Sequence, residues 1–342
     1  MTTIAVIPGD GIGPEVTAEA VTLLDDMQLG LDFDVLDHVN ADTYLATGRG
    51  MSEQDVERVR NATSALFGAI GDPRVRTPDY GRDVLLRMRF ELDLYVNHRP
   101  AYLWDPRLSP LRDERRRQVD CVIVRENSEG LYSGFGGTLR RGTPDEMAID
   151  DEVSTHLGIS RVLDYAFSIA RESVCMVDKS NAVRHGGQLW QRCWQEAAQR
   201  HPDIRRSHLY VDVAAMNLVT DPSAFDVIVT NNSYGDILSD LAAGLVGGLG
   251  MAASANLNPQ NGFGLYEPVH GSAPDLAGQG RANPIGAILS AALLCDGLNL
   301  PRQASAIRAA VSTAVTAGRC TPDIGGSLST RQAGAAIRAA LT

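Results

Sequence analysis

The sequence predicts an α/β protein built as one large domain or as two closely associated domains. Short runs of apolar and β-branched residues recur along the chain, and each run is typical of a buried strand. Segments with apolar residues at every third or fourth position separate these runs and predict helices. The alternation of the two patterns favours an α/β fold. The chain has 342 residues, of which 44% are hydrophobic, and this is enough for a sizeable core.

The predicted elements follow one another along the chain. Strands are expected at residues 4–7, 33–36, 65–67, 119–124, 173–177, 207–213 and 227–230. Helices are expected at residues 14–27, 53–62, 160–171 and 187–200. The alanine-rich tail, residues 284–341, predicts two or three more helices, and residues 137–150 interrupt the pattern as a protruding segment.

Charge and cysteine content argue against several classes of function. A net charge of -11 and a pI near 5.1 argue against nucleic acid as a main partner, because phosphate binding needs clustered Lys and Arg. We expect no signal peptide and no membrane span, because the chain shows neither a basic, apolar leader nor a run of about 18 apolar residues. The five scattered cysteines, never in CxxC spacing, favour reduced thiols and a cytoplasmic protein.

The N-terminal stretch IAVIPGDGIGPEV reads as a strand, a glycine turn and a helix with Pro14 at an early helical position. It imitates the GxGxxG dinucleotide fingerprint, and Asp32 or Asp34 stands near the place of the acidic residue of that motif. The third glycine position holds Pro14, so the fingerprint fails. The turn is either a structural connection or a place where a ligand approaches the backbone.

Two acids, Asp236 and Asp240, are expected to project from one face of a helix, one turn apart. Taken alone, they also fit a helix cap and a surface acid, which the helix dipole favours. The apolar and glycine-rich residues around them indicate a buried helix, in which two acids require a cation. Ligands made only of oxygen favour Mg²⁺ or Mn²⁺. Asp212, at the end of a predicted strand, is either a third ligand or a helix cap.

A second group of candidates can bind anions or move protons. Arg89, Arg99 and Arg125 lie near apolar segments, and a guanidinium matches a carboxylate through two parallel hydrogen bonds. Together they are compatible with an anionic substrate, although each alone also fits a surface position or a structural ion pair. Lys179 and Tyr132 are the available proton-transfer groups. A cation beside a lysine lowers its pKa, so that the amine can act as a general base.

Several motifs, in order along the chain, resemble those of one family. They are GDGIGPEV, the segment from Arg89 to Pro100, VREN with EGLYSG, DKSN, YGDILSD with GGLG, and EPVHGSAPDLAG with ANP. Together they are similar to the β-decarboxylating dehydrogenases, which comprise the isopropylmalate, isocitrate, homoisocitrate and tartrate dehydrogenases. The stretches GAIGDP, LLRMRFELD and GTPDE are closest to the isopropylmalate dehydrogenases of actinobacterial type.

The resemblance implies a two-domain α/β fold that is not a Rossmann fold, with the active site in the cleft between the domains. Residues 1–99 and 248–342 would form the cofactor-binding domain, and residues 100–247 the substrate and dimerisation domain. An arm at residues 135–152 would help to form a homodimer. The active sites would be shared, since Lys179 and Asp212 are implied to reach the site from the partner subunit.

The reaction implied is the NAD-dependent oxidative decarboxylation of a 3-substituted malate. Mg²⁺ or Mn²⁺ would be held by Asp236, Asp240 and the partner's Asp212, so that Asp212 is both a metal ligand and a catalytic residue. The partner's Lys179 would take the hydroxyl proton as hydride passes to NAD. Tyr132 would protonate the carbon that loses CO₂, and the three arginines would hold the malate carboxylates.

The cofactor site is implied to consist of one loop and two flanking residues. Its members are Ile12, His270, Gly271, Ser272, Ala273, Asp275 and Asn283. Asp275 can accept hydrogen bonds from a ribose 2′-OH and would repel a 2′-phosphate, so NAD is expected rather than NADP.

The resemblance also implies which residues contact the C3 substituent, namely Arg82, Leu85, Leu86, Asn181 and Ala182. The two leucines suit a branched alkyl group, so the expected reaction converts 3-isopropylmalate into 2-oxoisocaproate, as in leucine biosynthesis. Arg82 could equally meet an anionic group, and Ala182 enlarges the pocket. Another substituted malate, isocitrate, homoisocitrate or tartrate is therefore the alternative substrate. A catalytically silent binding protein is the alternative to an enzyme.

Overall fold

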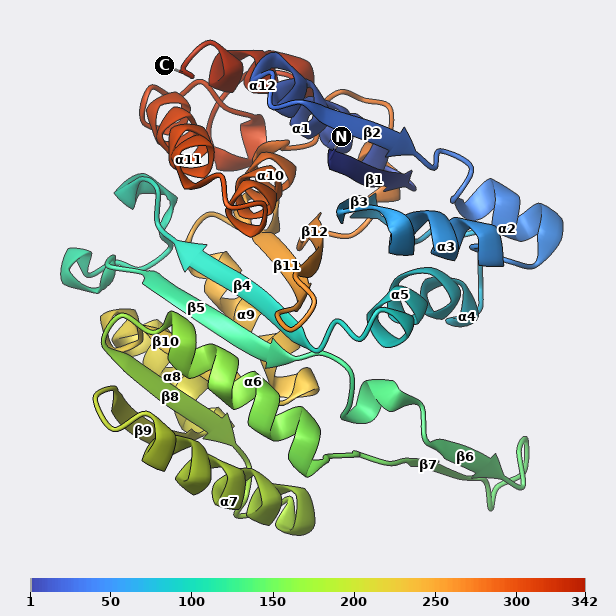
Figure 1. Cartoon of the computed structure of the whole chain (residues 1–342), viewed down its shortest axis with the longest axis vertical. Coiled ribbons are helices and arrows are strands. Elements are labelled where there is room, and N and C mark those ends of the chain that lie inside the picture. The colour runs from blue at the N-terminus through green and yellow to red at the C-terminus, as the bar shows by residue number, and fades with distance from the viewer. Residues whose placement is uncertain (1, 342) are drawn as a thin grey trace.

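The computed structural model describes residues 2–341, and its centre is a ten-stranded sheet in the order β2-β1-β3-β12-β11-β4-β5-β10-β8-β9 (Figure 1). The strands, including the separate pair β6 and β7, are β1 (Thr2–Gly9), β2 (Leu31–Val35), β3 (Ser64–Ala69), β4 (Val96–Tyr102), β5 (Asp120–Glu126), β6 (Gly136–Leu139), β7 (Met147–Asp150), β8 (Ser173–Asp178), β9 (Arg205–Tyr210), β10 (Val227–Thr230), β11 (Ala253–Asn258) and β12 (Phe263–Pro268). The α-helices are α1 (Gly13–Asp26), α2 (Ala41–Thr47), α3 (Glu53–Asn61), α4 (Asp79–Gly81), α5 (Arg87–Glu91), α6 (His156–Ile169), α7 (Arg184–Arg200), α8 (Val211–Thr220), α9 (Asn232–Leu245), α10 (Ile285–Gly297), α11 (Pro301–Thr316) and α12 (Thr330–Arg338).

The sheet has a parallel part at each end and antiparallel pairing in its middle. Strands β2, β1, β3 and β12 pair in parallel with one another, and so do β5, β10, β8 and β9. Strands β11 and β4 join these two parts through antiparallel ladders. Because β12 pairs with β3, the two ends of the chain build one part of the sheet together.

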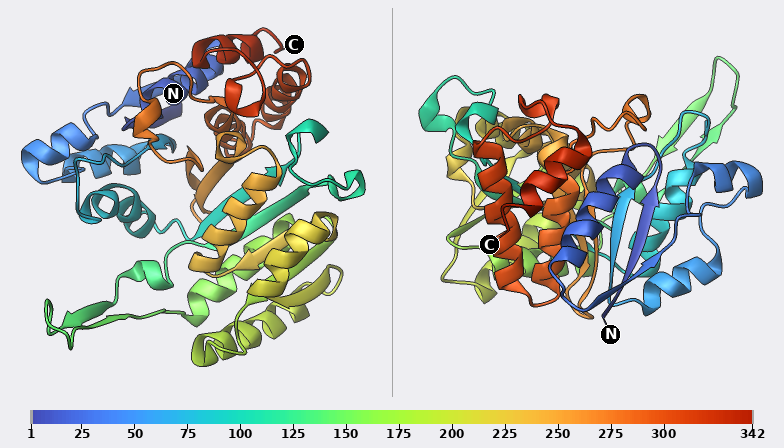
Figure 2. Two further views of the ribbon diagram at one scale, coloured as in Figure 1. Left: turned by 180° about the vertical axis from the view of Figure 1, so that it is seen from behind. Right: turned by 90° about the horizontal axis from the view of Figure 1, so that it is seen from above.

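Helices cover both faces of the part of the sheet that contains β5, β10 and β8. Helices α6 and α7 bury apolar residues against one face, and α8 and α9 against the other (Figures 1 and 2). In the other part, α10 is buried along most of its length and packs with α1 and α11. This layering leaves α9 on the opposite face of the sheet from α6 and α7.

The predicted elements are present, with one correction. Each predicted strand and helix corresponds to an observed one, and the tail contains the three helices α10, α11 and α12. The strand expected at residues 207–213, however, ends at Tyr210, and Val211 begins α8. Asp212 therefore lies in the first turn of a helix, where the dipole favours an acid, and not at the end of a strand.

Three central strands, β4, β11 and β12, have no counterpart among the predictions. Asn97 of β4 and Asn256 of β11 are fully buried, but asparagine and Pro100 in a strand read as signs of a loop. One hydrogen bond joins their amides, since Asn97 Nδ2 donates to Asn256 Oδ1 at 3.1 Å, and Asn256 Nδ2 donates to Glu267 Oε1 at 2.7 Å. A buried polar network thus replaced the apolar pattern on which the strand predictions depended.

The segment expected to protrude forms the β6–β7 hairpin, which projects from the body (Figure 1). Its side chains are exposed, including Phe135 just before it and Leu139 and Met147 within it. The domain boundary expected after residue 99 falls within β4, and the sheet is continuous there, so the division into two domains stays a prediction. No helix among residues 2–341 is both long and apolar enough to cross a membrane.

Candidate active site

One cavity of about 380 Å³ brings ten of the predicted site residues together. It lies among residues of the helical segment 79–91, strands β4 and β5, helix α9 and the loop that follows β12. The predicted residues in its lining are Arg82, Leu85, Leu86, Arg89, Arg99, Arg125, Tyr132, Asp236, His270 and Gly271. Residues expected to bind substrate, metal and cofactor therefore share a single space.

Arg125, close to the end of β5, is held by one face of α9. It is 1% exposed, and its Nε and Nη2 donate to Asn232 Oδ1 at 2.9 and 2.6 Å. Its Nη1 pairs with Asp236, one turn further along α9. Gly235 permits this close approach, because a Cβ there would lie 2.6 Å from the Cβ of Arg125. Gly235 and Asp236 thus allow α9 to pack closely against β5.

Arg99, on β4, reaches the same helix. Its Nη1 donates to Ser239 Oγ at 2.8 Å and lies 3.2 Å from Asp236 Oδ1. The same nitrogen is 3.5 Å from Asp240 Oδ1, which makes this a weak contact. Asp236 is therefore shared by two buried arginines, whereas Asp240 is bound only loosely.

Arg89, on α5, is fixed by a buried polar network. Its Nη2 donates to Glu267 Oε1 at 3.2 Å, and Asn256 Nδ2 donates to the same oxygen at 2.7 Å. Asn97 and Asn127 in turn donate to Asn256 Oδ1 at 3.1 and 2.9 Å. The network connects β4, β11 and β12 beneath the cavity. The sequence prediction omitted Glu267, although EPVHG was among the motifs and a buried arginine needs an acid.

The cavity favours an anionic ligand. Its lining contains four arginines but only two carboxylates, those of Asp236 and Glu267. Burial, together with the like charges of Arg89 and Arg99, lowers the pKa of the Arg125 guanidinium to about 9. The Nε atoms of Arg89 and Arg99 are buried and have no hydrogen-bond partner within residues 2–341. A carboxylate in the cavity would relieve this repulsion and could accept such donors.

Tyr132 is placed as a proton donor. Its hydroxyl donates to Asp236 Oδ2 at 2.8 Å, and its ring centroid lies 5.0 Å from the guanidinium carbon of Arg125. Burial, and then the hydrogen bond to Asp236, raise the pKa of the phenol. The phenol is therefore protonated at neutral pH.

The two acids of α9 are one turn apart, as predicted, but the helix is not buried as expected. Ile237 is 64% exposed, and the side chains of Asp236 and Asp240 are 36% and 53% exposed. Desolvation raises the pKa of Asp236, but the charges of Arg125 and Arg99 outweigh it and lower that pKa overall. Desolvation and the charge of Asp236 raise the pKa of Asp240 despite Arg99.

These properties fit a hard divalent cation. Both residues offer carboxylate oxygens, which Mg²⁺ and Mn²⁺ prefer. Asp240 is partly desolvated and makes only the 3.5 Å contact with Arg99, so its oxygens are free to bind a cation that would also stabilise its charge. Asp212, the third predicted ligand, is not among the residues that line this cavity.

Lys179 and Asp212 lie outside the cavity and pair with each other. Their Nζ and Oδ1 atoms are 2.5 Å apart, and this hydrogen bond lowers the pKa of the Asp212 carboxylate. The side chain of Asp212 is 63% exposed, and that of Lys179 is 27% exposed. Lys179 is also the only lysine in the chain, which otherwise uses arginine for its strongly basic positions. This compositional signal was missed in the sequence analysis, and it sets Lys179 apart because an amine loses its proton more readily than a guanidinium.

The surroundings of this pair are exposed and partly apolar. Asn181 and Ala182, which follow Lys179, are exposed and do not line the cavity. Met216 and Val219 of α8 are 57% and 40% exposed, and Ile237 of the adjacent α9 is exposed as well. Helices α8 and α9 thus have exposed apolar side chains, and α8 also contains Asp212.

The segment from Asp79 to Glu91 supplies the apolar wall of the cavity. A π-helical turn, Arg82–Leu86, joins α4 to α5, and such turns are frequent at functional sites. It places Leu85 and Leu86 in the lining. Arg82 donates from Nη2 to Ser133 O at 3.2 Å and packs against Gly134, where a Cβ would lie 2.3 Å from its guanidinium.

The predicted cofactor loop is held by the N-terminal glycine turn. Ile12 N donates to Ser272 O at 2.8 Å. Gly11 has a φ of 58°, and a Cβ there would lie 1.9 Å from that same oxygen. The GDGIG turn therefore makes a structural connection to this loop, and the approach of a ligand to its backbone stays a prediction. Asp10, which the sequence prediction passed over, fixes the turn by accepting hydrogen bonds from Ala41 N and Gly71 N.

The remaining candidates for cofactor binding differ in their exposure to solvent and in the hydrogen bonds that their side chains already make. His270 lies at the cavity with its Nδ1 2.9 Å from Gly271 O, and burial lowers the pKa of its imidazole. Asp275 is exposed and follows Ala273, whose φ is 39°. Asn283 is buried and already bonded, since its Nδ2 donates to Asp323 Oδ2 at 2.9 Å. Asp275 is thus free to meet a ligand, whereas Asn283 is committed to the fold.

Comparison with known proteins identifies the family. Residues 3–337 match the model of the isocitrate/isopropylmalate dehydrogenases. The chain belongs to this family. Curated relatives include a 3-isopropylmalate dehydrogenase of Beutenbergia cavernae, 44% identical with 97% of this chain and 98% of the relative covered, and one of Corynebacterium glutamicum, 45% identical with 99% of each covered. The solved isocitrate dehydrogenase of Methylococcus capsulatus is 34% identical and superposes with a TM-score of 0.90 over 100% of this chain and 99% of that chain. The family and the fold class predicted from the motifs are confirmed.

Proposed function

We propose that the protein catalyses the NAD-dependent oxidative decarboxylation of 3-isopropylmalate to 2-oxoisocaproate. The observation that carries this is the cavity that joins an excess of arginines to the apolar wall of Leu85 and Leu86. A malate with a branched alkyl group matches both parts of this lining, because its two carboxylates suit the arginines and its apolar substituent suits the leucines. Arg82 is engaged with Ser133 O, which favours the alkyl substituent over an anionic one. Relatives named 3-isopropylmalate dehydrogenase at 43–47% identity support the same substrate.

Each residue of the cavity has a part in this reaction. Arg89, Arg99 and Arg125 hold the two carboxylates, and their fixed positions keep the hydroxyl-bearing carbon facing the cofactor loop. Tyr132, protonated and bonded to Asp236, delivers a proton to the carbon that loses CO₂. The presence of all these groups favours an enzyme over a silent binding relative.

The proton acceptor for the substrate hydroxyl comes from a second copy of the chain. The partner's Lys179 takes that proton, since no lysine other than Lys179 exists and in its own chain it lies outside the cavity. The exposed apolar residues of α8 and α9, and those of the β6–β7 hairpin, fit a homodimer interface. Residues 1–99 with 248–342 and residues 100–247 would be the two domains on either side of the cleft.

Two groups complete the chemistry. Asp236, Asp240 and the partner's Asp212 would hold Mg²⁺ or Mn²⁺, and Ile12, residues 270–273 and Asp275 would hold NAD. When bound, the cation supplies electrostatic stabilisation for charge on oxygen, and NAD supplies the hydride acceptor. The buried, reduced state of the five cysteines fits a cytoplasmic enzyme.

The proposal is tested with a panel of malates. NADH formation is followed with Mn²⁺ and 3-isopropylmalate, isocitrate, homoisocitrate, tartrate or malate, and kcat/KM is compared across the panel. We expect 3-isopropylmalate to rank first, with unsubstituted malate lower by about 10- to 200-fold, because burying a few methyl groups is worth about 1–3 kcal/mol. A higher kcat/KM for isocitrate or tartrate would overturn the substrate, and no turnover by a folded protein would overturn the activity.

A further inference from the structure

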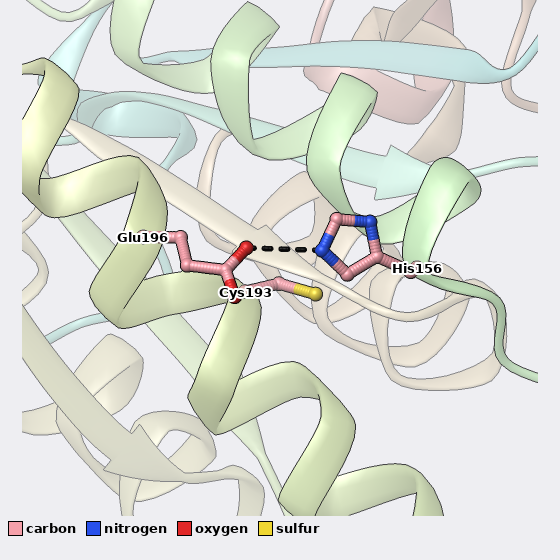
Figure 3. A group of neighbouring side chains, drawn as sticks. All are labelled: His156, Cys193 and Glu196. Carbon is pink, nitrogen blue, oxygen red and sulfur yellow. Dashed lines mark hydrogen bonds and ion pairs between the residues drawn. The ribbon is translucent and has the colours of Figure 1, made fainter.

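A second cluster of metal-ligating side chains lies far from the cavity, between α6 and α7 (Figure 3). His156 is the first residue of α6, and Cys193 and Glu196 stand three positions apart on α7. Residues three apart share one face of a helix, so the thiol and the carboxylate both face His156. These helices cover the opposite face of the sheet from α9, so the cluster takes no part in the reaction proposed above.

The spacing of the three ligand atoms suits a single ion. A nitrogen of His156, the sulfur of Cys193 and a carboxylate oxygen of Glu196 all lie within 4.8 Å of one another. The imidazole Nε2 is 2.9 Å from Glu196 Oε2. Zinc binds nitrogen and oxygen at about 2.0–2.2 Å and sulfur at about 2.3 Å, so its ligands stand about 3–4 Å apart. Small rotations of exposed side chains would therefore close the cluster around an ion.

The cluster is open to solvent on one side and closed on the other. Cys193 is buried and forms the floor, whereas the side chains of His156 and Glu196 are 56% and 42% exposed. An ion can thus enter from solvent and retain water as a fourth ligand. A simple surface ion pair between the imidazole and the carboxylate would not require a thiol directly below it.

A further side chain orients the imidazole. Ser160, one turn after His156 on α6, places its Oγ 3.4 Å from the imidazole Nδ1, so that Nε2 faces Glu196 and Cys193. Metal-binding histidines generally make a second contact of this kind through the other ring nitrogen. Burial raises the pKa of the Cys193 thiol overall, and the hydrogen bond with the Ser160 hydroxyl offsets only part of that rise.

We propose that His156, Cys193 and Glu196 form a binding site for Zn²⁺ or a similar borderline-soft divalent cation, distinct from the Mg²⁺ or Mn²⁺ site of the cleft. Thiolate and imidazole ligands select such ions, while the carboxylates of α9 select hard cations. Binding releases the thiol proton to solvent as the sulfur–metal bond forms, so atoms and charge balance without any redox partner.

The position of the cluster indicates what the ion would do. His156 begins α6 directly after the segment that leaves the β6–β7 hairpin, and the preceding Thr155 N donates to Glu129 Oε2 at 2.8 Å. Glu129 lies in the loop that leads to Tyr132. The ion would therefore tie the base of the hairpin and this loop to α7, and would stabilise the fold without supplying chemistry.

The test uses Co²⁺ as a spectroscopic probe of the full-length protein, with excess Mg²⁺ present to fill the hard site. Thiolate ligation to Co²⁺ gives a charge-transfer band in the near-ultraviolet, which carboxylates and imidazoles alone do not give. We expect the band to saturate at one Co²⁺ per chain and to disappear when Zn²⁺ is added. It should be lost in Cys193→Ser.

Two further variants keep the test decisive if Cys193→Ser folds poorly. The double variant His156→Gln with Glu196→Gln changes only partly exposed side chains, and we expect it to weaken Zn²⁺ binding by more than about 100-fold, since even second contacts to ligands are worth 10- to 100-fold. The matched control, His185→Gln with Glu172→Gln, removes the same groups from exposed positions elsewhere and should bind as the wild type does. Absence of the band in the wild type, or equal Zn²⁺ affinity in the double variant and the control, would overturn the proposal.

Discussion

The cavity and the Lys179–Asp212 pair are two parts of one proposed catalytic set, and they differ in how the chain prepares them. In the cavity, Arg125 is 1% exposed and Arg99 8% exposed, and both are fixed to α9. Asp212 is 63% exposed and Lys179 is paired with it on the surface. One part is assembled within a single chain, while the other is presented outward.

The difference follows from what each part must do. Several arginines buried together repel one another and are expensive to place, so they need a rigid network such as Glu267 with Asn256. A base that accepts the substrate proton must reach the substrate, and Lys179 instead contacts Asp212 outside the cavity. In the proposed dimer, both residues would reach the partner's cavity.

Replacing Lys179 should have the largest effect. Lys179→Met removes the proton acceptor, and we expect kcat to fall by about 10²- to 10⁴-fold, the usual value of general base catalysis. Lys179→Arg retains the positive charge beside Asp212, but a guanidinium does not release its proton at neutral pH, so it should be equally inactive. Steady-state NADH formation measures both. Wild-type kcat in Lys179→Arg would show that charge, and not proton transfer, is what this position supplies.

The two acids of α9 should respond differently to amidation. Asp240→Asn removes a loosely held carboxylate, so we expect about a 100-fold rise in the Mn²⁺ concentration needed for activity, with an unchanged melting temperature. Asp236→Asn should also lose metal-dependent turnover. In addition it leaves Arg125 and Arg99 without their shared partner, which should cost about 3 kcal/mol of unfolding free energy. Titration of activity with Mn²⁺ and thermal unfolding separate the two effects. Full activity of either variant at the wild-type Mn²⁺ concentration would show that this acid is not a required ligand.

Charge reversal at Asp275 should change the choice of cofactor. The side chain is exposed, so Asp275→Lys should leave the structure intact. We expect the ratio of kcat/KM for NAD to that for NADP to fall by about 10- to 100-fold, because the new cation attracts the 2′-phosphate instead of repelling it. Kinetics with both cofactors measure the ratio. An unchanged ratio would contradict the assignment of Asp275 to the ribose.

A smaller effect, on the pH dependence of stability, is expected from His98, which lies on the face of β4 opposite Arg99. His98 points there into a second cavity of about 500 Å³, with its Nδ1 3.0 Å from Tyr165 Oη. Burial, and then the charge of Arg308, lower the pKa of His98 to about 4, although Asp296 opposes this. The unfolded chain, with a histidine pKa near 6.5, then binds more protons than the folded one between about pH 6.5 and 4.

His98 should therefore make the protein less stable as the pH falls through that range. In His98→Leu, this part of the acid sensitivity should disappear, so the unfolding free energy of the variant relative to the wild type should rise between pH 7 and pH 4.5. Denaturant unfolding at both values measures it. A constant difference between the two proteins would show that His98 titrates alike in the folded and unfolded chain.

Much of the fold and of the site could be predicted from local pattern, and the failures have clear causes. Asp236 and Asp240 lie four positions apart, and this spacing alone places them on the same face of α9. The strands that contain Asn97 and Asn256 could not be predicted, because asparagine in a sequence is typical of a loop. Its burial in a strand depends on hydrogen-bond partners that only the structure shows. The exposure of Ile237 was likewise hidden, because the sequence pattern does not distinguish an exposed apolar residue of a helix from a buried one.

A heterodimer tests most directly whether the two parts belong to different chains. Lys179→Met and Asp240→Asn chains are co-expressed with different affinity tags, and the dimer that carries one of each is purified. If the sites are shared, one site combines an intact cavity with an intact Lys179 and Asp212, while the other carries both defects. At the Mn²⁺ concentration at which the Asp240→Asn homodimer is inactive, shared sites should give about half of the wild-type kcat per dimer, as expected for one of two symmetry-related sites. A heterodimer as inactive as the two parent homodimers would contradict it.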